Sequence, residues 1–347
     1  MRIAQVLTAS TGGIGRHVAS LVPRLVQRGH AVRVFCPPLT ATTHELAEAG
    51  ADVRPLGDLL ARGVRGAEVV HAHGYKAAAR AWAGARLAGP PLVVSWHNAV
   101  LPDHPARGRA RLLQRLVARG ADLTLGASAD LVAEAQRLGA RRARLLPVAA
   151  PPVPVTRMSR RAARAALGVA PAEVLVLTVA RLAPQKNLGL VLDVAAALRD
   201  HRGLRFAVAG EGPEQAALAE RIATERLPVT LLGHRDDLGA LLAAADIALL
   251  TSTWEARALV AQEALLAGLP LVSTAVGGVP DLVGDAAILV PPGNPAAAAR
   301  AVAELADDPA ERARLADAGR RQAATWPTED DVVTELLTAY ADLVRAR

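Results

Sequence analysis

Two glutamates eight residues apart, Glu255 and Glu263, are the strongest candidates for chemistry in this chain. The surrounding pattern predicts that Glu255 lies in a loop after a strand, and that a helix begins near Ala258–Leu259 and ends at Gly268. Glu263 then lies about one turn inside the helix, and free backbone N–H groups lie between the two acids. Such a site suits a ligand with hydroxyls at both ends and a phosphate in the middle, which is the shape of a nucleotide-sugar.

Basic side chains could bind the phosphates of such a ligand. The chain has 40 Lys and Arg residues, of which only Lys76 and Lys186 are lysine. A compact ammonium and a planar guanidinium are not interchangeable, so we interpret both lysines as functional. Arg181 and Lys186 follow the same predicted strand, where a guanidinium and an amine could bind two phosphate oxygens.

Glycine-rich turns follow two predicted strands. Gly12 and Gly13 come after the first strand, where backbone amides could approach an anion closely. This string fits neither the dinucleotide fingerprint nor a Walker loop, and a tight strand-to-helix turn is the alternative. Gly210, Glu211 and Gly212 form a second turn of this kind.

Histidines follow two further strands. We expect His71 and His73 to point to opposite faces of their extended segment, which argues against a two-histidine metal site. His71 is interpreted as a packed residue at the strand end, whereas His73 could face a ligand. The imidazole of His97 could donate to one hydroxyl or hold another. The sequence has no acidic cluster of the Asp-x-Asp type, which predicts chemistry without a metal.

Short β-rich runs alternate with Ala/Leu/Arg-rich helical stretches, which predicts an α/β protein with two parallel sheets of six strands each. The predicted strands are Arg2–Leu7, Ala31–Cys36, Glu68–His71, Leu92–Ser95, Leu123–Ala127, Ala143–Leu146, Val174–Ala180, Arg205–Ala209, Val229–Leu232, Ile247–Leu250, Leu271–Thr274 and Ala286–Val290. A proline-rich linker is predicted within Pro147–Arg164. The last predicted element is an amphipathic helix, Glu329–Arg345.

Composition excludes several classes of protein. The chain has 347 residues, enough for two domains, and no apolar run long enough to span a bilayer. Its single cysteine, Cys36, and an N-terminus without a signal-peptide pattern favour a cytoplasmic location. The net charge of +7 could indicate nucleic acid, but aromatic residues are only 2% and the arginines are dispersed. An anionic membrane surface is at least as plausible a charged partner. The basic amphipathic stretch Pro105–Arg119 could lie on such a surface, but a solvated Arg-rich helix is the favoured interpretation of this stretch.

The ordered string from Glu255 to Gly278 contains both glutamates, Gly268-Leu269-Pro270 and Gly277-Gly278. It resembles the signature of GT-B glycosyltransferases, in particular the retaining family 4 of the glycosyl-1 group. The resemblance implies two Rossmann-like domains with a deep interdomain cleft and a C-terminal crossover helix. Residues 1–155 with 328–347 would form the acceptor domain, and residues 165–325 the donor domain.

The resemblance also implies roles for individual residues. The catalytic set would be Glu255, His97, Arg181 and Lys186, with Glu255 binding the transferred sugar without acting as a covalent nucleophile. The donor-binding set would be Gly13, Glu211, Gly212, His234, Leu259, Val260 and Glu263, with His234 at the base and Glu263 at the ribose. The acceptor-binding set would be Gly12, His73 and Lys76.

The implied activity is a retaining, metal-independent transfer of a hexose or N-acetylhexosamine from a nucleoside-diphosphate sugar to an acceptor hydroxyl. It would need no cofactor, and would serve cell-envelope glycan, glycolipid or secondary-metabolite synthesis, with a lipid-linked acceptor as one option. The chain has Glu255-Ala256-Arg257-Ala258-Leu259 where the family usually has Glu-Gly-x-Pro-Leu, which leaves the donor open. The alternatives are a UDP-sugar 2-epimerase of GT-B architecture and a nucleotide-sugar-binding module without catalysis.

Overall fold

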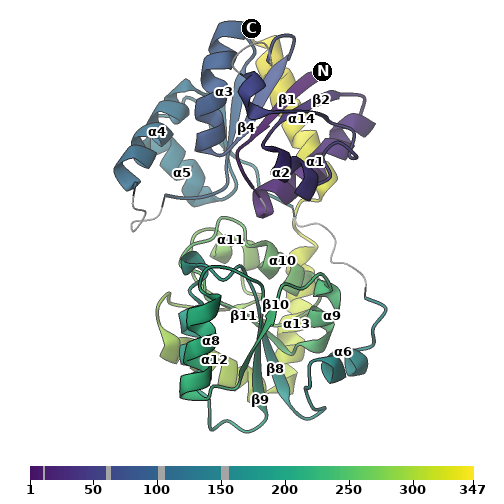
Figure 1. Cartoon of the computed structure of the whole chain (residues 1–347), viewed down its shortest axis with the longest axis vertical. Helices are drawn as coiled ribbons and strands as arrows, with labels where there is room; N and C mark the ends of the chain where they lie inside the picture. Colours follow the sequence, from purple (N-terminus) through teal and green to yellow (C-terminus); the bar gives the residue numbers. More distant parts are fainter. Residues whose placement is uncertain (11, 60–63, 101–105, 150–155) are drawn as a thin grey trace. The chain divides into compact units, whose positions relative to one another are not determined.

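The computed structural model describes residues 1–10, 12–59, 64–100, 106–149 and 156–347. The chain forms two compact units. Unit 1 comprises Met1–Pro151 and Pro327–Arg347, and unit 2 comprises Pro152–Trp326. Each unit contains one parallel sheet covered by helices (Figure 1). Residues 150–155 of the predicted linker and Pro105 of the predicted basic stretch lie outside the described residues.

The sheet of unit 1 has seven parallel strands in the order β3-β2-β1-β4-β5-β6-β7. The strands are β1 (Arg2–Leu7), β2 (Ala31–Phe35), β3 (Asp52–Arg54), β4 (Val69–His73), β5 (Leu92–Trp96), β6 (Leu123–Gly126) and β7 (Ala143–Leu145). The prediction of six strands was wrong by one because β3 has three residues and one apolar side chain, too few to give a period-two pattern.

Helices cover both faces of this sheet. They are α1 (Gly13–Gln27), α2 (Pro38–Thr43), α3 (Tyr75–Ala88), α4 (Arg107–Gly120), α5 (Ala129–Arg137) and α14 (Glu329–Arg345), with a 3-10 turn η1 (Leu56–Leu59). From β1 the chain passes through α1 to β2 on one side of β1, whereas β4, β5, β6 and β7 follow one another on the other side. Right-handed crossovers therefore place α1 on one face and α3, α4 and α5 on the other, as Figure 1 shows.

The C-terminal helix α14 completes unit 1. Thr328 and Asp331 form a capping box at its start, and Arg24 of α1 pairs with Glu329 in its first turn. Its apolar face joins the same core as α1, with Leu336 and Tyr340 almost fully buried. The amphipathic pattern of the sequence predicted this helix with the same bounds.

The sheet of unit 2 has six parallel strands in the order β10-β9-β8-β11-β12-β13. They are β8 (Val174–Val179), β9 (Leu204–Ala209), β10 (Val229–Gly233), β11 (Ile247–Leu250), β12 (Leu271–Thr274) and β13 (Ile288–Val290). The helices are α6 (Arg160–Ala166), α7 (Leu188–Ala197), α8 (Gln215–Glu225), α9 (Leu238–Ala244), α10 (Leu259–Leu266), α11 (Val279–Val283), α12 (Pro295–Asp307) and α13 (Pro309–Ala323), with a 3-10 turn η2 (Pro184–Lys186).

Two hydrophobic clusters lie on the two faces of this sheet. One contains side chains from α9, α10 and α11, and the other contains side chains from α7, α8 and α12. Burial on both faces explains why strands such as β8 are nearly continuous apolar runs rather than alternating ones. Among the described helices, none is both long and apolar enough to cross a bilayer.

Candidate functional site

Glu255 lies at the carboxyl end of β11, where a parallel sheet places its ligand-binding residues. Its carboxylate is buried, and Oε1 accepts hydrogen bonds from Lys186 Nζ at 2.5 Å and from Ser252 Oγ at 2.6 Å. Its backbone carbonyl accepts a bond from the Gly278 amide at 2.9 Å. A Cβ atom on Gly277, whose φ is +52°, would lie 2.0 Å from that carbonyl oxygen, so the Gly-Gly pair allows this close approach.

Lys186 is held by bonds between the loops that follow β8 and β11. Thr251 Oγ1 donates to the Lys186 carbonyl at 2.9 Å, and the Thr253 amide donates to the Gln185 carbonyl at 2.8 Å. About a quarter of the Lys186 side chain remains exposed (26%), so its ammonium can contact an anion as well as Glu255. Arg181 is exposed at the end of β8, and within the described ranges its guanidinium forms no ion pair.

The turn after β9 packs directly on the backbone around Arg181. A Cβ atom on Gly210 would lie 1.9 Å from the Ala180 carbonyl oxygen, and one on Gly212 would lie 2.2 Å from the Leu182 carbonyl oxygen. The Leu182 amide donates to the Glu211 carbonyl at 2.9 Å. These two glycines therefore fix the turn beside the loop that carries Arg181.

Glu211 also connects this turn to the end of β10. Its Oε1 accepts a bond from the His234 amide at 3.3 Å, and the exposed His234 ring contacts Asp236 at 3.0 Å. The carboxyl ends of β10, β9, β8 and β11, which are successive strands in the sheet, thus carry most of the predicted donor-binding and catalytic residues of unit 2.

The helix α10 begins at Leu259 and ends at Leu266, with Gly268 at φ +68° after it, as the sequence predicted. In the described part of the chain, the amides of Leu259 and Val260 donate to no backbone carbonyl, because the first bonds of the helix run from residues 261 and 262 to Ala258. Glu263 is buried on this helix. Free amides at a helix N-terminus favour an anion.

Arg257 lies in the segment Glu255–Leu259, where the sequence differs from Glu-Gly-x-Pro-Leu, and its side chain contacts residues of unit 2. Its guanidinium lies 5.7 Å from the ring centroid of Trp326, and its Nε donates to Gln262 Oε1 at 3.4 Å. Burial lowers the pKa of Arg257 to about 10.

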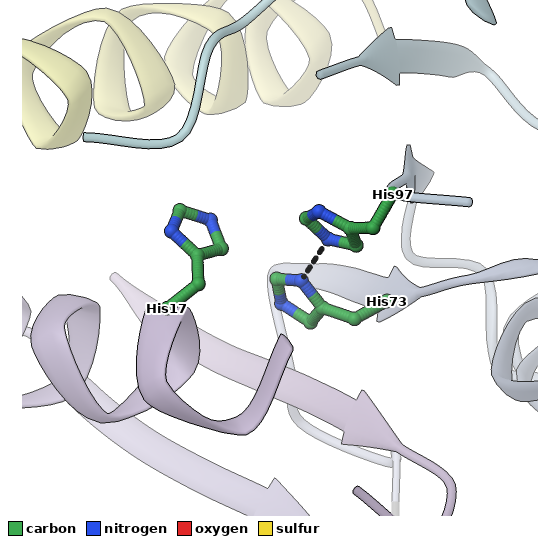
Figure 2. A group of neighbouring side chains, drawn as sticks. All are labelled: His17, His73 and His97. Atoms are coloured by element: carbon green, nitrogen blue, oxygen red, sulfur yellow. Dashed lines mark hydrogen bonds between the residues drawn. The ribbon is translucent and has the colours of Figure 1, made fainter. Parts of the chain in front are cut away.

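Four histidines gather in unit 1 at the carboxyl ends of β1, β4 and β5. The expectation that His71 and His73 point to opposite faces was wrong. Both lie within β4, where residues two apart share a face, and their ring centroids are 4.2 Å apart. His97 follows β5 and stacks on His73 with ring centroids 5.4 Å apart, and its Nε2 lies 3.1 Å from His73 Nδ1 (Figure 2).

A chain of buried hydrogen bonds supports these rings and fixes the proton position of His73. His73 Nε2 donates to Gln5 Oε1 at 2.7 Å, so the neutral His73 ring has its lone pair on Nδ1. Gln5 Nε2 donates to the Tyr340 hydroxyl at 3.3 Å, and that hydroxyl bonds His71 Nδ1 at 2.6 Å. His71 Nε2 bonds Ser95 Oγ at 2.7 Å. Helix α14, through Tyr340, thereby takes part in the site.

His17, in the second turn of α1, completes the group. Its ring centroid lies 5.8 Å from that of His73 and 5.4 Å from that of His97. Burial lowers the pKa of His17 to about 4 and that of His71 to about 3, and it holds the pKa values of His73 and His97 well below 6.5. All four imidazoles are therefore neutral at pH 7.

The predicted acceptor residues occupy three places in unit 1. Gly12 caps α1 and Gly13 begins it, whereas His73 is buried at the end of β4. Lys76 is exposed in the first turn of α3. His73 pairs with His97, and within the described ranges Lys76 contacts neither ring.

Sequence reasoning missed Gln5, His17, Ser252 and the role of Tyr340. Gln5 carried a signal, because it is the one polar residue in the apolar run that follows Arg2 in the strand Arg2–Leu7. Tyr340 was assigned only to the apolar face of its helix. Ser252 and His17 gave no signal of their own, since their partners come from distant parts of the chain.

The basic stretch forms α4, with Leu112 (60% exposed) and Leu116 (59% exposed) on its surface. These leucines lie among Arg109, Arg111 and Arg115, and Arg111 lies 3.6 Å from Glu134 of α5.

Two protein-family models match the chain. "Glycosyl transferase 4-like domain" matches residues 12–151, and "Glycosyl transferases group 1" matches residues 159–322. "Glycogen synthase" of Mycobacterium tuberculosis (strain ATCC 25618 / H37Rv) is 30% identical over 376 residues, covering 91% of this chain and 88% of that protein. "D-inositol 3-phosphate glycosyltransferase" of Streptomyces avermitilis is 28% identical over 383 residues, covering 99% of this chain and 80% of that protein.

Among solved structures, Anabaena Alr3699/HepE in complex with UDP-glucose is similar over 100% of both chains, with a TM-score of 0.85 and 23% identity. The sucrose-phosphate synthase of Thermosynechococcus elongatus is similar over 100% of both chains, with a TM-score of 0.81 and 20% identity. These likenesses show that the chain shares the fold of both proteins.

Proposed function

Because the chain belongs to the family of group 1 glycosyltransferases and has their GT-B architecture, we propose that it transfers a hexose or N-acetylhexosamine from a UDP- or GDP-sugar to an acceptor hydroxyl. We propose further that anomeric configuration is retained and that no metal or cofactor takes part. The observation that carries this proposal is the ion pair between Lys186 and Glu255, whose residues lie 69 positions apart and meet at the ends of β8 and β11.

The leaving diphosphate needs its developing negative charge stabilised as the anomeric C–O bond breaks. Arg181 and Lys186 supply two positive charges, and the amides of Leu259 and Val260 supply two donors at the start of α10. Such donors, already oriented before reaction, each contribute about 10²–10³ in rate, or roughly 3–4 kcal/mol. These groups support the proposal that the charge is stabilised without a metal.

The remaining unit 2 residues bind the donor. Glu263 accepts bonds from the ribose hydroxyls, and Glu255 binds hydroxyls of the transferred sugar. The turn Gly210–Gly212 and the neighbouring His234 contact the nucleotide, with His234 at the base. The Alr3699/HepE structure holds UDP-glucose, which makes UDP-glucose the first donor to test.

Unit 1 supplies the groups for the acceptor. His97 donates to a sugar hydroxyl or holds the acceptor hydroxyl, since its imidazole is neutral. Gly12 and Lys76 bind the phosphate of a charged acceptor, and Gly13 faces the phosphate of the donor. The relatives' names refer to glycogen and to D-inositol 3-phosphate, so a glycan and a phosphorylated polyol are both included in the acceptor panel.

A lipid-linked acceptor would place the enzyme at the cytoplasmic face of a membrane. The two exposed leucines among the arginines of α4 support contact with an anionic surface. Cosedimentation with anionic and neutral vesicles tests this proposal. Equal recovery with both kinds of vesicle would mean that α4 is a solvated helix.

The deciding experiment measures nucleotide release from UDP- and GDP-sugars, with and without acceptors, after treatment with EDTA. Release that requires an acceptor and survives EDTA supports the proposal. Isomerised sugar without nucleotide release would identify an epimerase, and binding alone a module without catalysis.

The variants Lys186→Ala and Glu263→Ala should abolish release, whereas Glu220→Ala, an exposed acid on α8, should not change it. Wild-type rates in the first two variants would contradict the site assignment. The anomeric configuration of the product, measured by NMR, tests retention.

A further inference from the structure

We propose that His17, His73 and His97 form a zinc site in unit 1. Within the ranges that the structure describes, this is the single group of three histidine, cysteine or acidic residues close enough to share an ion, with all three ligand atoms within 4.8 Å of one another. The three side chains come from three adjacent segments: α1, the end of β4 and the loop after β5.

The distances suit zinc with a small movement of one ring. Tetrahedral coordination with Zn–N bonds of 2.0–2.1 Å separates two ligand nitrogens by about 3.3 Å. His73 Nδ1 and His97 Nε2 are 3.1 Å apart, so they already have nearly this spacing. His17 needs to approach by at most about 1.5 Å to complete the set. Figure 2 shows its ring on the same side of the strands as the other two.

Gln5 prepares His73 as a ligand. Metal-bound histidines usually donate their other ring N–H to an oxygen, which fixes the tautomer and orients the ring. His73 Nε2 makes this bond to Gln5 Oε1 at 2.7 Å, and its Nδ1 is therefore the nitrogen with a free lone pair. For His97 to coordinate through Nε2, its proton moves to Nδ1, which is an ordinary tautomer change.

His17 offers a ring nitrogen that no other group in the described part of the chain engages. Its ring is 6% exposed, and among the described residues no hydrogen bond to that ring is found, so a nitrogen lone pair is available to a metal ion. Since every ligand is a neutral imidazole and no thiolate or carboxylate takes part, Zn²⁺ fits better than Ca²⁺ or Mg²⁺. The fourth position would hold water or an anion.

Zinc would withdraw His97 from substrates, and we infer that it inhibits transfer. This last consequence rests on the function proposed above, but the site itself does not, because binding is measured directly on the protein without any substrate.

The test is calorimetric titration of EDTA-treated, dialysed protein with ZnCl₂, repeated with Co²⁺ to record visible d–d absorption. Wild type should bind one Zn²⁺ per chain, with the strong absorption of tetrahedral Co²⁺. His17→Asn should weaken Zn²⁺ binding more than about 10-fold, since even supporting residues cost 10–100-fold. His30→Asn is the matched control, because it removes a half-buried imidazole that contacts the N-terminal amine at 2.9 Å, and it should leave binding unchanged.

Three outcomes would overturn the site: no Zn²⁺ binding at micromolar concentrations, equal binding by His17→Asn and wild type, or loss of binding in His30→Asn. Circular dichroism of each variant confirms folding. Transfer assays then separate the two proposals, because His17→Asn should retain the wild-type rate without zinc and resist inhibition by zinc. A protein that binds zinc through His17 but transfers no sugar would keep the site and lose the function.

Discussion

At the scale of single residues, the compact amine of Lys186 fits its contact with Glu255 in a way that a guanidinium does not. Lys186→Arg keeps the positive charge, but the longer, planar guanidinium cannot fit the 2.5 Å contact with Glu255 Oε1 beside Ser252. We expect the turnover number to fall by about 10²–10³, as for loss of an oriented charge-assisted donor. Steady-state kinetics measure this effect. Arg199→Lys, the reverse exchange at an exposed position of unit 2, is the control. A Lys186→Arg enzyme as active as wild type would show that any cation suffices.

The close approach of Gly277 to Glu255 gives a second prediction at this scale. Gly277→Ala places a methyl group 2.0 Å from the Glu255 carbonyl oxygen at a φ of +52°. Gly293→Ala is matched in backbone, with a φ of +70°, but has no atom within 4 Å of its Cβ. We expect Gly293→Ala to cost roughly 1 kcal/mol of unfolding free energy through strain alone, and Gly277→Ala to cost more and to reduce activity. Denaturant titration and kinetics measure both, and equal effects of the two substitutions would mean that the carbonyl moves away at no cost.

The members of the proposed unit 2 site come from the sequence, but their contacts do not. Glu255, Glu263, Arg181 and Lys186 are singled out by type and spacing within short strings, and their roles stay predictions. The ion pair between Lys186 and Glu255 depends on β8 and β11 being neighbours in the sheet, although two other strands separate them along the chain. Ser252 was missed for this reason, since its role is visible only when the buried carboxylate beside it is in place.

At the scale of elements, α14 connects the end of the chain to the histidines near its beginning. Tyr340→Phe keeps the apolar packing of α14 but leaves Gln5 Nε2 and His71 Nδ1 without their shared hydroxyl. We expect a loss of about 1–3 kcal/mol in the unfolding free energy of unit 1, because both groups are buried. Tyr75→Phe, at the only other tyrosine of the chain, should have little effect.

Denaturant titration of the two tyrosine variants gives the comparison. Equal stability of Tyr340→Phe and wild type would mean that the hydroxyl contributes nothing to the network. The sequence placed α14 correctly because its apolar positions repeat at helical spacing, but spacing alone could not distinguish Tyr340 from the leucines around it. The same limit applies to β3, whose three residues are assigned by their pairing with β2 rather than by their own pattern.

At the scale of the whole molecule, twelve of the thirteen strands in the described residues, and both sheets, were predictable because parallel strands buried on both faces give long apolar runs. The histidine cluster was not predictable, since it gathers side chains from residues 17, 71, 73 and 97 through the strand order β1-β4-β5. This cluster makes the stability of unit 1 depend on pH. The dependence falls in a pH range above the range in which carboxylates titrate.

The direction of this pH dependence follows from the pKa values of the histidines in the folded and unfolded states. Burial lowers the pKa of His17 to about 4 and that of His71 to about 3, whereas both are about 6.5 in the unfolded chain. The unfolded state therefore binds more protons below pH 6.5, and the stability present above that pH is lost as pH falls toward 4 and 3. Carboxylates such as Asp52, whose pKa is lowered below 3.8, lose their contribution only in more acidic solution.

We therefore expect the unfolding free energy of unit 1 to fall between pH 7 and pH 5 by up to about 1.4 kcal/mol per pH unit for each buried histidine. Denaturant titrations in EDTA at pH 7.5, 6.5, 5.5 and 5.0 measure this slope, with hydrogen exchange of β4 and β5 reporting on unit 1 alone. His17→Asn should reduce the slope, because one proton-binding group is removed from the difference between the two states. A flat profile above pH 5, or a slope that His17→Asn does not change, would mean that these imidazoles are protonated in the folded protein as readily as in the unfolded chain.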